Sequence, residues 1–215
     1  MGPHSEYVHD LLKLLEMKKY SYSPKYLGQD KQGREILTYI QGDVARDVKL
    51  SDVILEKIVL MIKMFHDATS GSKLAKNKEV VCHGDLAPWN TVLRNGEPIG
   101  FIDFDGAKPG RRIEDLAYFL WTFLELGKKI PAKIQVTRMK RLCDIYGYSR
   151  GSELAYAIVN EQHKVLTHRE NLVKNSENPE LRKFSASKIR EIKREIEWVK
   201  KNKNLIERSF DMGSI

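Results

Sequence analysis

The sequence predicts an α+β fold in which a small amino-terminal part with two strands precedes a larger, mainly helical part. Five long segments after residue 49 are predicted as helices, whereas the strand signals before residue 42 are short and bounded by turn residues. Between the early helices and the later ones, Asn95-Gly96 joins two short apolar runs, which is the strongest local signal for a β-hairpin.

The composition is that of a soluble globular domain. The chain has 215 residues, of which 41% are hydrophobic and 31% are charged, so one domain with an ample core is expected. No apolar run is long enough to cross a membrane, and the amino terminus lacks the pattern of a secretory signal, so we expect a cytoplasmic protein. The two cysteines, Cys82 and Cys143, are far apart, which argues against a zinc cluster or a disulfide framework.

The formal net charge of +8 leaves a second class of function open. A basic protein can bind nucleic acid or an anionic membrane surface, and such binding falls steeply with salt and does not depend on Mg²⁺. The sequence has no basic motif interleaved with aromatic residues, so nucleic acid is not expected as a partner. The basic residues of the last predicted helix could lie on a membrane surface, but the solvated outer face of a packed helix is the simpler interpretation, so a membrane is not expected either.

The amino-terminal elements follow from spacing and turn residues. A helix is predicted over residues 5–18, with Ser5 as N-cap and an apolar face of Val8, Leu11, Leu12 and Leu15. Two short strands are expected near residues 25–27 and 35–40, with a turn at residues 30–33 between them.

The later elements are mainly helices. Residues 50–68 form a long helix with Ser51 as N-cap, and His66 near its end is expected to make a structural hydrogen bond. A short strand at residues 80–81 follows, and Pro109-Gly110 is predicted as a turn. The remaining helices are expected over residues 112–126, 131–146, 152–174 and 180–208.

The hairpin is expected to bring three polar side chains together. If Asn95-Gly96 is a type I′ turn, Arg94 faces Glu97 and Asn90 faces Phe101. Asn90 and Asp103 then emerge at the same end of the hairpin as the loop that carries Asp85. The alternative is a purely structural role, in which all three are ordinary turn and cap residues, since Asp and Asn are common at both kinds of position.

The three side chains suit phosphate transfer. Asn90 and Asp103 offer the oxygen ligands that Mg²⁺ prefers, and Asp85 remains able to accept a proton. The spacing His-x-Asp-x-x-x-x-Asn, with a further acid after the next strand, is the arrangement of kinase catalytic and metal loops. The joint spacing therefore favours a catalytic site over isolated turn residues.

These motifs resemble the aminoglycoside phosphotransferase family of small-molecule kinases. The resemblance rests on His83-Gly84-Asp85-x-x-x-x-Asn90 with Ile102-Asp103-Phe104-Asp105, and it extends to Gly33-Arg34-Glu35 and Glu114-Asp115-Leu116-Ala117-Tyr118. It implies a protein-kinase-like fold with a shortened amino-terminal lobe, residues 1–42, and a mainly helical carboxy-terminal lobe, residues 43–215, that carries the catalytic loop and the metal-binding hairpin. It also implies transfer of the γ-phosphate of ATP or GTP, with Mg²⁺, to a hydroxyl of an aminoglycoside-like or other small molecule.

The resemblance implies a role for each matching residue. Asp85 is the catalytic base, while Asn90 and Asp103 hold the metal. His83 braces the catalytic loop, Asp115 anchors its backbone, and Asp105 either assists the metal or caps the loop. By the same resemblance, the purine of the nucleotide docks beside the hinge residues Tyr39, Ile40 and Gln41.

One departure from the family pattern leaves an alternative function open. The strands that normally precede the first helix are missing, together with their phosphate-covering loop and the lysine that pairs with the nucleotide phosphates. A kinase-fold pseudoenzyme that binds nucleotide or a partner without transfer is therefore the alternative. The sequence does not predict the acceptor, the choice between ATP and GTP, or the oligomeric state.

Overall fold

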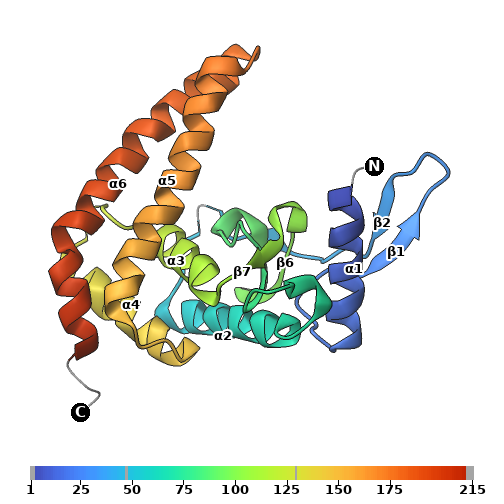
Figure 1. Cartoon of the computed structure of the whole chain (residues 1–215), viewed down its shortest axis with the longest axis horizontal. Coiled ribbons are helices and arrows are strands. Elements are labelled where there is room, and N and C mark those ends of the chain that lie inside the picture. The colour runs from blue at the N-terminus through green and yellow to red at the C-terminus, as the bar shows by residue number, and fades with distance from the viewer. Residues whose placement is uncertain (1–2, 47, 129, 212–215) are drawn as a thin grey trace. The chain divides into compact units, whose positions relative to one another are not determined.

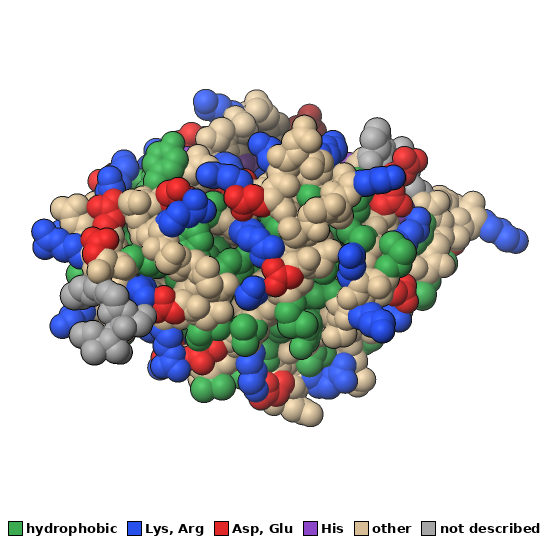
Figure 2. Space-filling model, turned by 60° about the horizontal axis from the view of Figure 1, so that its bottom comes forward, with side chains coloured by type: hydrophobic (Ala, Val, Ile, Leu, Met, Phe, Trp, Pro, Cys, Tyr) green, Lys and Arg blue, Asp and Glu red, His purple; other side chains and the backbone are tan. Residues whose placement is uncertain are grey.

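The computed structural model describes residues 3–46, 48–128 and 130–211 of the chain. The chain forms two compact units, residues 1–119 and residues 120–215, which are described separately below. The predicted lobe boundary at residue 42 is a different division and stays a prediction. Figure 2 shows one face of the molecule, on which basic and acidic side chains are interspersed.

The first unit begins with helix α1 (Pro3–Met17), close to the predicted bounds. The prediction that Ser5 is the N-cap is wrong, because the helix begins two residues earlier and includes Ser5. The apolar residues that the spacing assigned to one face are buried: Val8, Leu11, Leu12 and Leu15. Strands β1 (Tyr26–Gln29) and β2 (Glu35–Leu37) form the predicted antiparallel hairpin, although β2 ends at Leu37 and not at the predicted residue 40. His9 of α1 stacks on Tyr26, with ring centroids 4.1 Å apart, and this contact attaches the hairpin to the helix.

Helix α2 (Asp52–Thr69) supplies much of the core of the first unit. As predicted, Ser51 is its N-cap, and the Ser51 side chain accepts a hydrogen bond from the Ile54 amide. The side chains of Leu55, Ile58, Ile62 and Phe65 are fully or almost fully buried, which makes this helix the support on which the candidate site rests.

Short strands complete the first unit (Figure 1). Strands β3 (Asp43–Val44), β5 (Thr91–Arg94) and β6 (Glu97–Phe101) form one antiparallel sheet in the order β3-β5-β6. Strand β4 (Val80–Cys82) pairs separately with β7 (Lys108–Gly110). Three single 3₁₀ turns lie between these strands or beside them, namely η1 (Lys73–Ala75), η2 (Pro88–Asn90) and η3 (Phe104–Gly106).

The predicted turn at Pro109-Gly110 is wrong. Both residues belong to β7, where Pro109 is opposite Val81 and Gly110 is opposite Val80. Pro lacks a backbone donor, but it is tolerated on an edge strand such as this one in a two-stranded sheet. A Cβ atom at Gly110 would lie 2.6 Å from Cys82 Sγ, so the glycine serves close packing between the strands.

Helix α3 (Arg112–Phe123) runs from the first unit into the second. The second unit continues with α4 (Ala132–Tyr146), α5 (Gly151–Asn175) and α6 (Pro179–Asp211), all close to the predicted bounds. Helices α5 and α6 form a long antiparallel hairpin (Figure 1). Among the described residues, none of the helices is long and apolar enough to span a membrane.

Candidate active site

The β5–β6 hairpin places the ends of the two candidate loops side by side. Asn95 and Gly96 have φ angles of 52° and 80°, as the predicted type I′ turn requires. Arg94 faces Glu97, as predicted. The prediction that Asn90 faces Phe101 is wrong, because the register shifts between Val92 and Leu93 and Thr91 takes that place.

The register shift leaves the convergence of the loops intact. The carbonyl oxygen of Asn90 accepts a hydrogen bond of 3.0 Å from the Ile102 amide, so the two chain segments are still joined beyond the ends of the strands. A Cβ atom at Gly100 would lie 2.9 Å from Ile40 Cδ1. The hairpin is therefore irregular where residue 40 packs against it.

Asp85, the predicted base, is partly buried and held by three side chains. Tyr118 donates its hydroxyl to Oδ1 over 2.6 Å. Oδ2 accepts hydrogen bonds from Asn90 Nδ2, at 2.8 Å, and from Trp89 Nε1, at 3.2 Å. These contacts fix the direction in which the carboxylate faces.

Asn90 is buried and turned by the same contacts. Its amide nitrogen donates both to Asp85 Oδ2 and, at 3.0 Å, to the Asp85 carbonyl oxygen. Because Nδ2 donates its hydrogen bonds to Asp85, Oδ1 is the side-chain atom that remains able to bind a metal ion. The donor set of Asn90 and Asp103 therefore fits a hard cation such as Mg²⁺.

Asp115 connects the core to the backbone of the catalytic loop. Its carboxylate accepts hydrogen bonds from the His83 amide, at 2.7 Å, and the Gly84 amide, at 3.0 Å. His66 Nε2 contacts the same carboxylate at 3.0 Å, so the predicted structural hydrogen bond of this histidine is confirmed. Burial raises the pKa of Asp115, but the hydrogen bond and charge of His66 outweigh it and hold the pKa below its usual value.

His83 is fully buried and its ring spans the two loops. Nδ1 accepts a hydrogen bond from the Asp85 amide at 3.3 Å, and Nε2 lies 3.2 Å from the Ile102 carbonyl oxygen, to which it donates. Burial lowers the pKa of His83, which favours the neutral ring. This geometry suits a bracing residue, since both ring nitrogens are used by the backbone.

The segment around Asp103 is held in an unusual conformation. Asp103 has φ 64° and ψ 68°, in the left-handed region that residues other than glycine seldom occupy, and its side chain is exposed. Nearby, a Cβ atom at Gly84 would lie 2.4 Å from the Gly106 carbonyl oxygen. We call this close approach of the two backbones the Gly84–Gly106 contact. Asp105 is exposed, and its carbonyl oxygen lies 2.5 Å from His4 Nε2.

The predicted hinge residues lie beside the hairpin. The carbonyl oxygen of Gln41 accepts a hydrogen bond of 3.0 Å from Arg94 Nε, and Ile40 packs on Gly100. Tyr39 is 84% exposed. Their role in binding the purine stays a prediction.

Two residues of the site were missed by sequence reasoning, namely Tyr118 and Trp89. Tyr118 lies one helical turn after Asp115 on α3, so the i, i+3 spacing placed it on the same face as the predicted anchor. Nothing local in the sequence pointed to the Trp89 contact.

Three buried residues of types that can bind a metal lie close together next to the catalytic loop, but their ligand atoms already form hydrogen bonds within the protein. The ligand atoms of His66, Cys82 and Asp115 lie within 4.8 Å of one another, and all three residues are buried. The Asp115 carboxylate is used by the loop amides, and Cys82 Sγ donates to the Arg111 carbonyl oxygen at 3.3 Å. Burial raises the pKa of the Cys82 thiol, which keeps it protonated. The cluster therefore acts as a structural brace.

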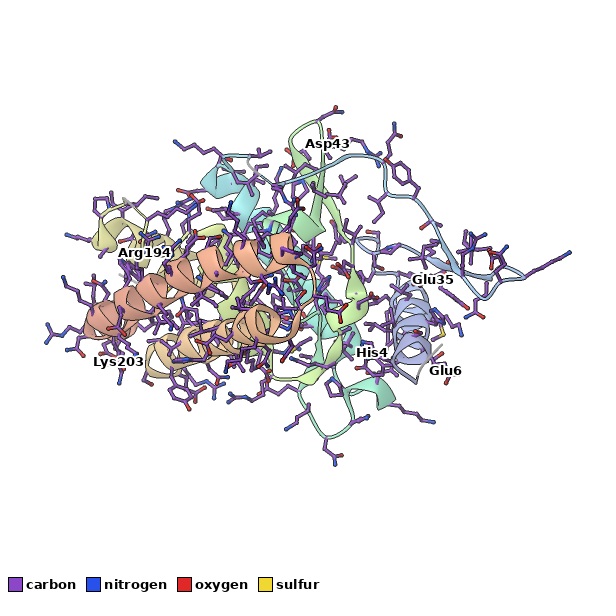
Figure 3. The ribbon with its side chains drawn as sticks, turned by 90° about the horizontal axis from the view of Figure 1, so that it is seen from above. His4, Glu6, Glu35, Asp43, Arg194 and Lys203 are labelled. Carbon is purple, nitrogen blue, oxygen red and sulfur yellow. The ribbon has the colours of Figure 1, made fainter. Side chains whose placement is uncertain are left out.

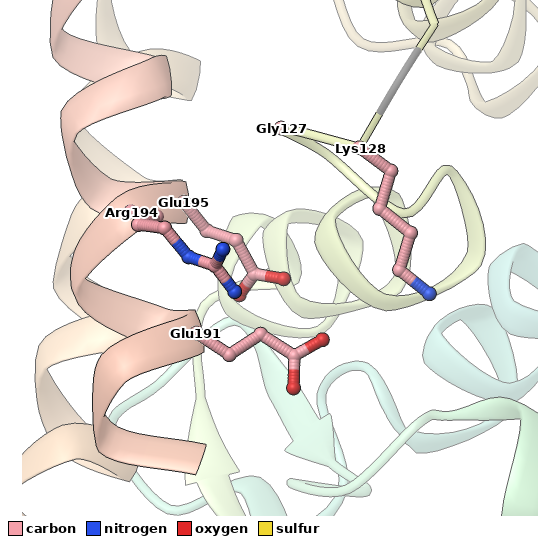
Figure 4. Close-up of a pocket in the computed structure, with 5 residues that line it drawn as sticks. All are labelled: Gly127, Lys128, Glu191, Arg194 and Glu195. Atoms are coloured by element: carbon pink, nitrogen blue, oxygen red, sulfur yellow. The ribbon is translucent and has the colours of Figure 1, made fainter. Parts of the chain in front are cut away.

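The second unit contains a hollow of about 450 Å³ that holds none of the predicted site residues. It is lined by Gly127, Lys128, Glu191, Arg194 and Glu195 (Figure 4). Trp121 Nε1 donates to Glu195 Oε2 over 2.9 Å. Burial raises the pKa of Glu195 despite this hydrogen bond.

Comparisons with known proteins agree with the geometry. Residues 69–154 match the model of a family described as the phosphotransferase enzyme family. The trifolitoxin immunity protein of Rhizobium leguminosarum bv. trifolii is 30% identical over 173 residues, which are 69% of this chain and 66% of that protein. The chain thus spans about two thirds of the length of this relative.

Solved structures share the fold. The aminoglycoside phosphotransferase APH(3'')-Id from Streptomyces rimosus, in complex with ADP and streptomycin, has a TM-score of 0.59 at 15% identity, over 74% of this chain and 80% of that chain. APH(2")-IIa in complex with gentamicin has a TM-score of 0.59 at 16% identity, over 90% of this chain and 82% of that chain. The predicted kinase-like α+β fold is confirmed.

Proposed function

Because the chain belongs to the phosphotransferase enzyme family and has the kinase-like fold of the aminoglycoside phosphotransferases, we propose that it transfers a phosphate group from a nucleotide to a hydroxyl of a small molecule. The observation that carries the proposal is the arrangement of Asp85 and Asn90, which are joined by a hydrogen bond of 2.8 Å on a loop that Asp115 anchors from the core. An unanchored loop would not fix a base in the direction of an acceptor.

In this proposal Asp85 orients the acceptor hydroxyl and takes its proton. Tyr118 and Trp89 hold its two oxygens in place, and acceptor binding would replace one of these contacts. Positioning of this kind, with a base of matched direction, is the main contribution that a protein makes to phosphate transfer.

Asn90 Oδ1 and the Asp103 carboxylate would hold Mg²⁺. The ion would neutralise charge on the transferred phosphate. The left-handed backbone at Asp103 directs this exposed carboxylate away from the core, and such strain is kept where the surrounding structure enforces it.

The donor is ATP or GTP, bound beside Tyr39, Ile40 and Gln41. Solved structures with the same fold contain either ADP or GDP, so the fold accommodates both purines. The acceptor is an aminoglycoside-like compound or another small metabolite, since related structures hold streptomycin, gentamicin or kanamycin. We expect the site to act in the cytoplasm.

A second candidate function is nucleotide binding without transfer. It is favoured by the full set of hydrogen bonds on Asp85, whose two carboxylate oxygens are both engaged by protein side chains. A base in that state needs the acceptor to displace a contact before it can act.

The change Asp85→Asn tests the proposal. We expect transfer to fall by about 10²- to 10⁴-fold, the usual contribution of a general base, while binding of the nucleotide with Mg²⁺ persists. Transfer is measured as ADP or GDP release against a panel of aminoglycosides and amino alcohols. The exposed Asp10→Asn makes the same chemical change away from the site and should leave the rate unaltered.

Nucleotide binding itself is tested by thermal stabilisation with ATP or GTP, each with and without Mg²⁺. A ligand that binds only the folded state raises its stability by mass action. We expect a rise that requires Mg²⁺ and disappears in Asp103→Ala. Stabilisation without turnover of any acceptor would favour the second candidate, and transfer by Asp85→Asn at the wild-type rate would exclude a base at this residue.

A further inference from the structure

The net positive charge of the chain belongs to one of its two compact units. Residues 120–215 contain 20 Lys and Arg against 12 Asp and Glu, whereas residues 1–119 contain 17 of each. The formal net charge of +8 therefore comes entirely from residues 120–215, and the unit that carries the candidate active site is neutral. Phosphate chemistry at the site does not account for this excess.

Helix α6 concentrates part of the excess along one face. Five basic residues recur at intervals of seven, four, seven and seven positions, which places them on the same side of a helix. All five are exposed. The opposite side of the helix is buried through Ile192, Ile196, Val199 and Ile206. We call this set the α6 basic stripe: Lys183, Arg190, Arg194, Lys201 and Arg208.

The stripe differs from most other cations of the same helix in having no acidic partners. Arg182 is the exception among those others, since its guanidinium donates to the Ser176 carbonyl oxygen at 2.9 Å. Lys188, Lys193, Lys200 and Lys203 each form an ion pair, with Glu191, Glu170, Glu197 and Glu207 respectively. No stripe residue forms an ion pair with any residue of the described part of the chain. Figure 3 marks Arg194 of the stripe and the paired Lys203 on this helix. Glu197 follows Arg194 by three residues and precedes Lys201 by four, so it lies on the same side of the helix, but it is paired with Lys200. The five cations of the stripe are therefore left for an external anion.

From its length and composition we propose that the α6 basic stripe binds the sugar–phosphate backbone of duplex nucleic acid, independently of sequence. At 1.5 Å per residue, the 25 steps from Lys183 to Arg208 span about 37 Å, close to the roughly 34–36 Å of one turn of duplex DNA. Cations spaced along that length can neutralise phosphates on both sides of a groove. This binding is separate from the proposed phosphate transfer.

Other polyanions fit the stripe less well. A helix that lies on a membrane inserts an apolar face, but the apolar face of α6 is buried inside the second unit. Single strands are bound through stacking on aromatic side chains, but the exposed aromatic beside the stripe, Phe184, already has the cations of Arg169 and Lys188 over its ring. Duplex backbone needs neither feature.

The test is fluorescence anisotropy of a labelled 20-base-pair duplex, titrated with the full chain at NaCl concentrations from 50 to 300 mM. The logarithm of the binding constant should fall with the logarithm of salt with a slope of about −4.5, since each neutralised phosphate contributes about −0.9. A stripe variant with all five residues changed to Gln should bind at least about tenfold more weakly at 100 mM NaCl and lose most of this slope.

The matched control removes the same charge from the neutral unit. It changes five exposed lysines to Gln and should keep both affinity and slope within about twofold of the wild type: Lys18, Lys31, Lys49, Lys73 and Lys78. If the fivefold stripe variant unfolds at a lower temperature, the single changes Arg194→Gln and Arg208→Gln replace it, and each should reduce the slope by about one.

Three results would overturn the proposal. The wild type could fail to bind the duplex at 50 mM NaCl. The control variant could lose as much affinity as the stripe variant, in which case the overall charge alone attracts the duplex. Vesicles containing phosphatidylserine could bind more tightly than the duplex and depend on the same five residues, in which case the stripe faces a membrane.

Discussion

Asp115 and Glu195 are both largely buried carboxylates, yet their surroundings shift their pKa values in opposite directions. Asp115 receives two loop amides and the His66 ring, which together outweigh burial and lower its pKa. Glu195 has the Trp121 indole as its hydrogen-bond donor, and burial prevails and raises its pKa. At the scale of the residue, the number of donors aimed at a carboxylate decides whether its charge stabilises the fold.

The change Asp115→Asn should destabilise the fold by about 3 kcal/mol, because it leaves buried partners unpaired. The pKa of Asp115 is lower in the folded state, so its stabilising contribution is complete above the usual value of 3.8 and is lost as the pH falls through the lowered pKa. Urea unfolding at pH 7 and at pH 3 should show a smaller acid loss in the variant than in the wild type.

The control for this change is Asp144→Asn, which removes an exposed carboxylate from an ion pair with Lys140 on α4. Exposed pairs contribute at most about 1 kcal/mol, so the effect at pH 7 should be much smaller. Equal losses in the two variants would contradict the anchoring role of Asp115.

The change Glu195→Gln should raise the unfolding temperature at pH 8. The pKa of Glu195 is higher in the folded state, so the folded chain binds this proton more tightly, and ionisation lowers stability as the pH rises above 4.5. The glutamine oxygen can still accept the hydrogen bond from Trp121. At pH 4, below the usual pKa, the two proteins should unfold at similar temperatures, and a gain of equal size at both values would exclude ionisation as the cause.

At the scale of the element, the sequence predicted those helices and turns whose structure is determined by residues close together in the chain. Asn95-Gly96 specified the turn of the β5–β6 hairpin, and helical spacing located each of the six helices found among the described residues. Contacts between residues that are far apart in the chain could not be predicted from the sequence. The register shift at Val92 occurs where Ile40 packs on Gly100, and Pro109 became part of a strand because β4 pairs with it.

In the candidate site, too, some residues could be predicted from local patterns in the sequence and others could not. The motif spacing selected Asp85, Asn90 and Asp103, because kinase-type loops place these residues at fixed intervals. The side chains that orient Asp85 include Tyr118, which comes from α3, and its hydroxyl reaches Asp85 only after the helix has packed. Such a contact depends on the position of a whole element, which no local pattern determines.

The Gly84–Gly106 contact gives a prediction about elements. Gly84→Ala should destabilise the fold by about 1–3 kcal/mol through backbone strain at φ +83°, and further through the clash with the Gly106 carbonyl. Gly71→Ala is the matched control, since Gly71 has φ +68° but nothing within 4 Å of an added Cβ atom. Only the Gly84 variant should also reduce phosphate transfer, and equal stability losses in the two variants would show that strain alone matters.

At the scale of the whole molecule, stability should differ widely among elements of the first unit. All three residues of β2 are exposed, and the β1–β2 sheet has only two strands. In α2, by contrast, Ile58, Val59, Ile62 and Phe65 are fully buried. Regions with few buried apolar contacts open with the least free energy.

Amide hydrogen exchange should therefore be fastest in β1 and β2 and slowest in the central turns of α2. Exchange followed by mass spectrometry at neutral pH should label residues 26–37 within the earliest time points, while residues 58–65 remain protected. Saturating nucleotide with Mg²⁺ should slow exchange in the loop at residues 83–90. Protection of β2 equal to that of α2 in the free protein would contradict this order.

The close approach of Gly84 and Gly106 also bears on how such a protein can diversify. Because the two backbones touch without side chains between them, the path of the main chain itself sets the separation of Asp85 from Asp103. Under the proposed function, substitutions elsewhere on the surface can alter which acceptor binds, while the spacing of the two acids stays constant. Acceptor preference can therefore change, under the proposed function, without a change in the relative positions of Asp85 and Asp103.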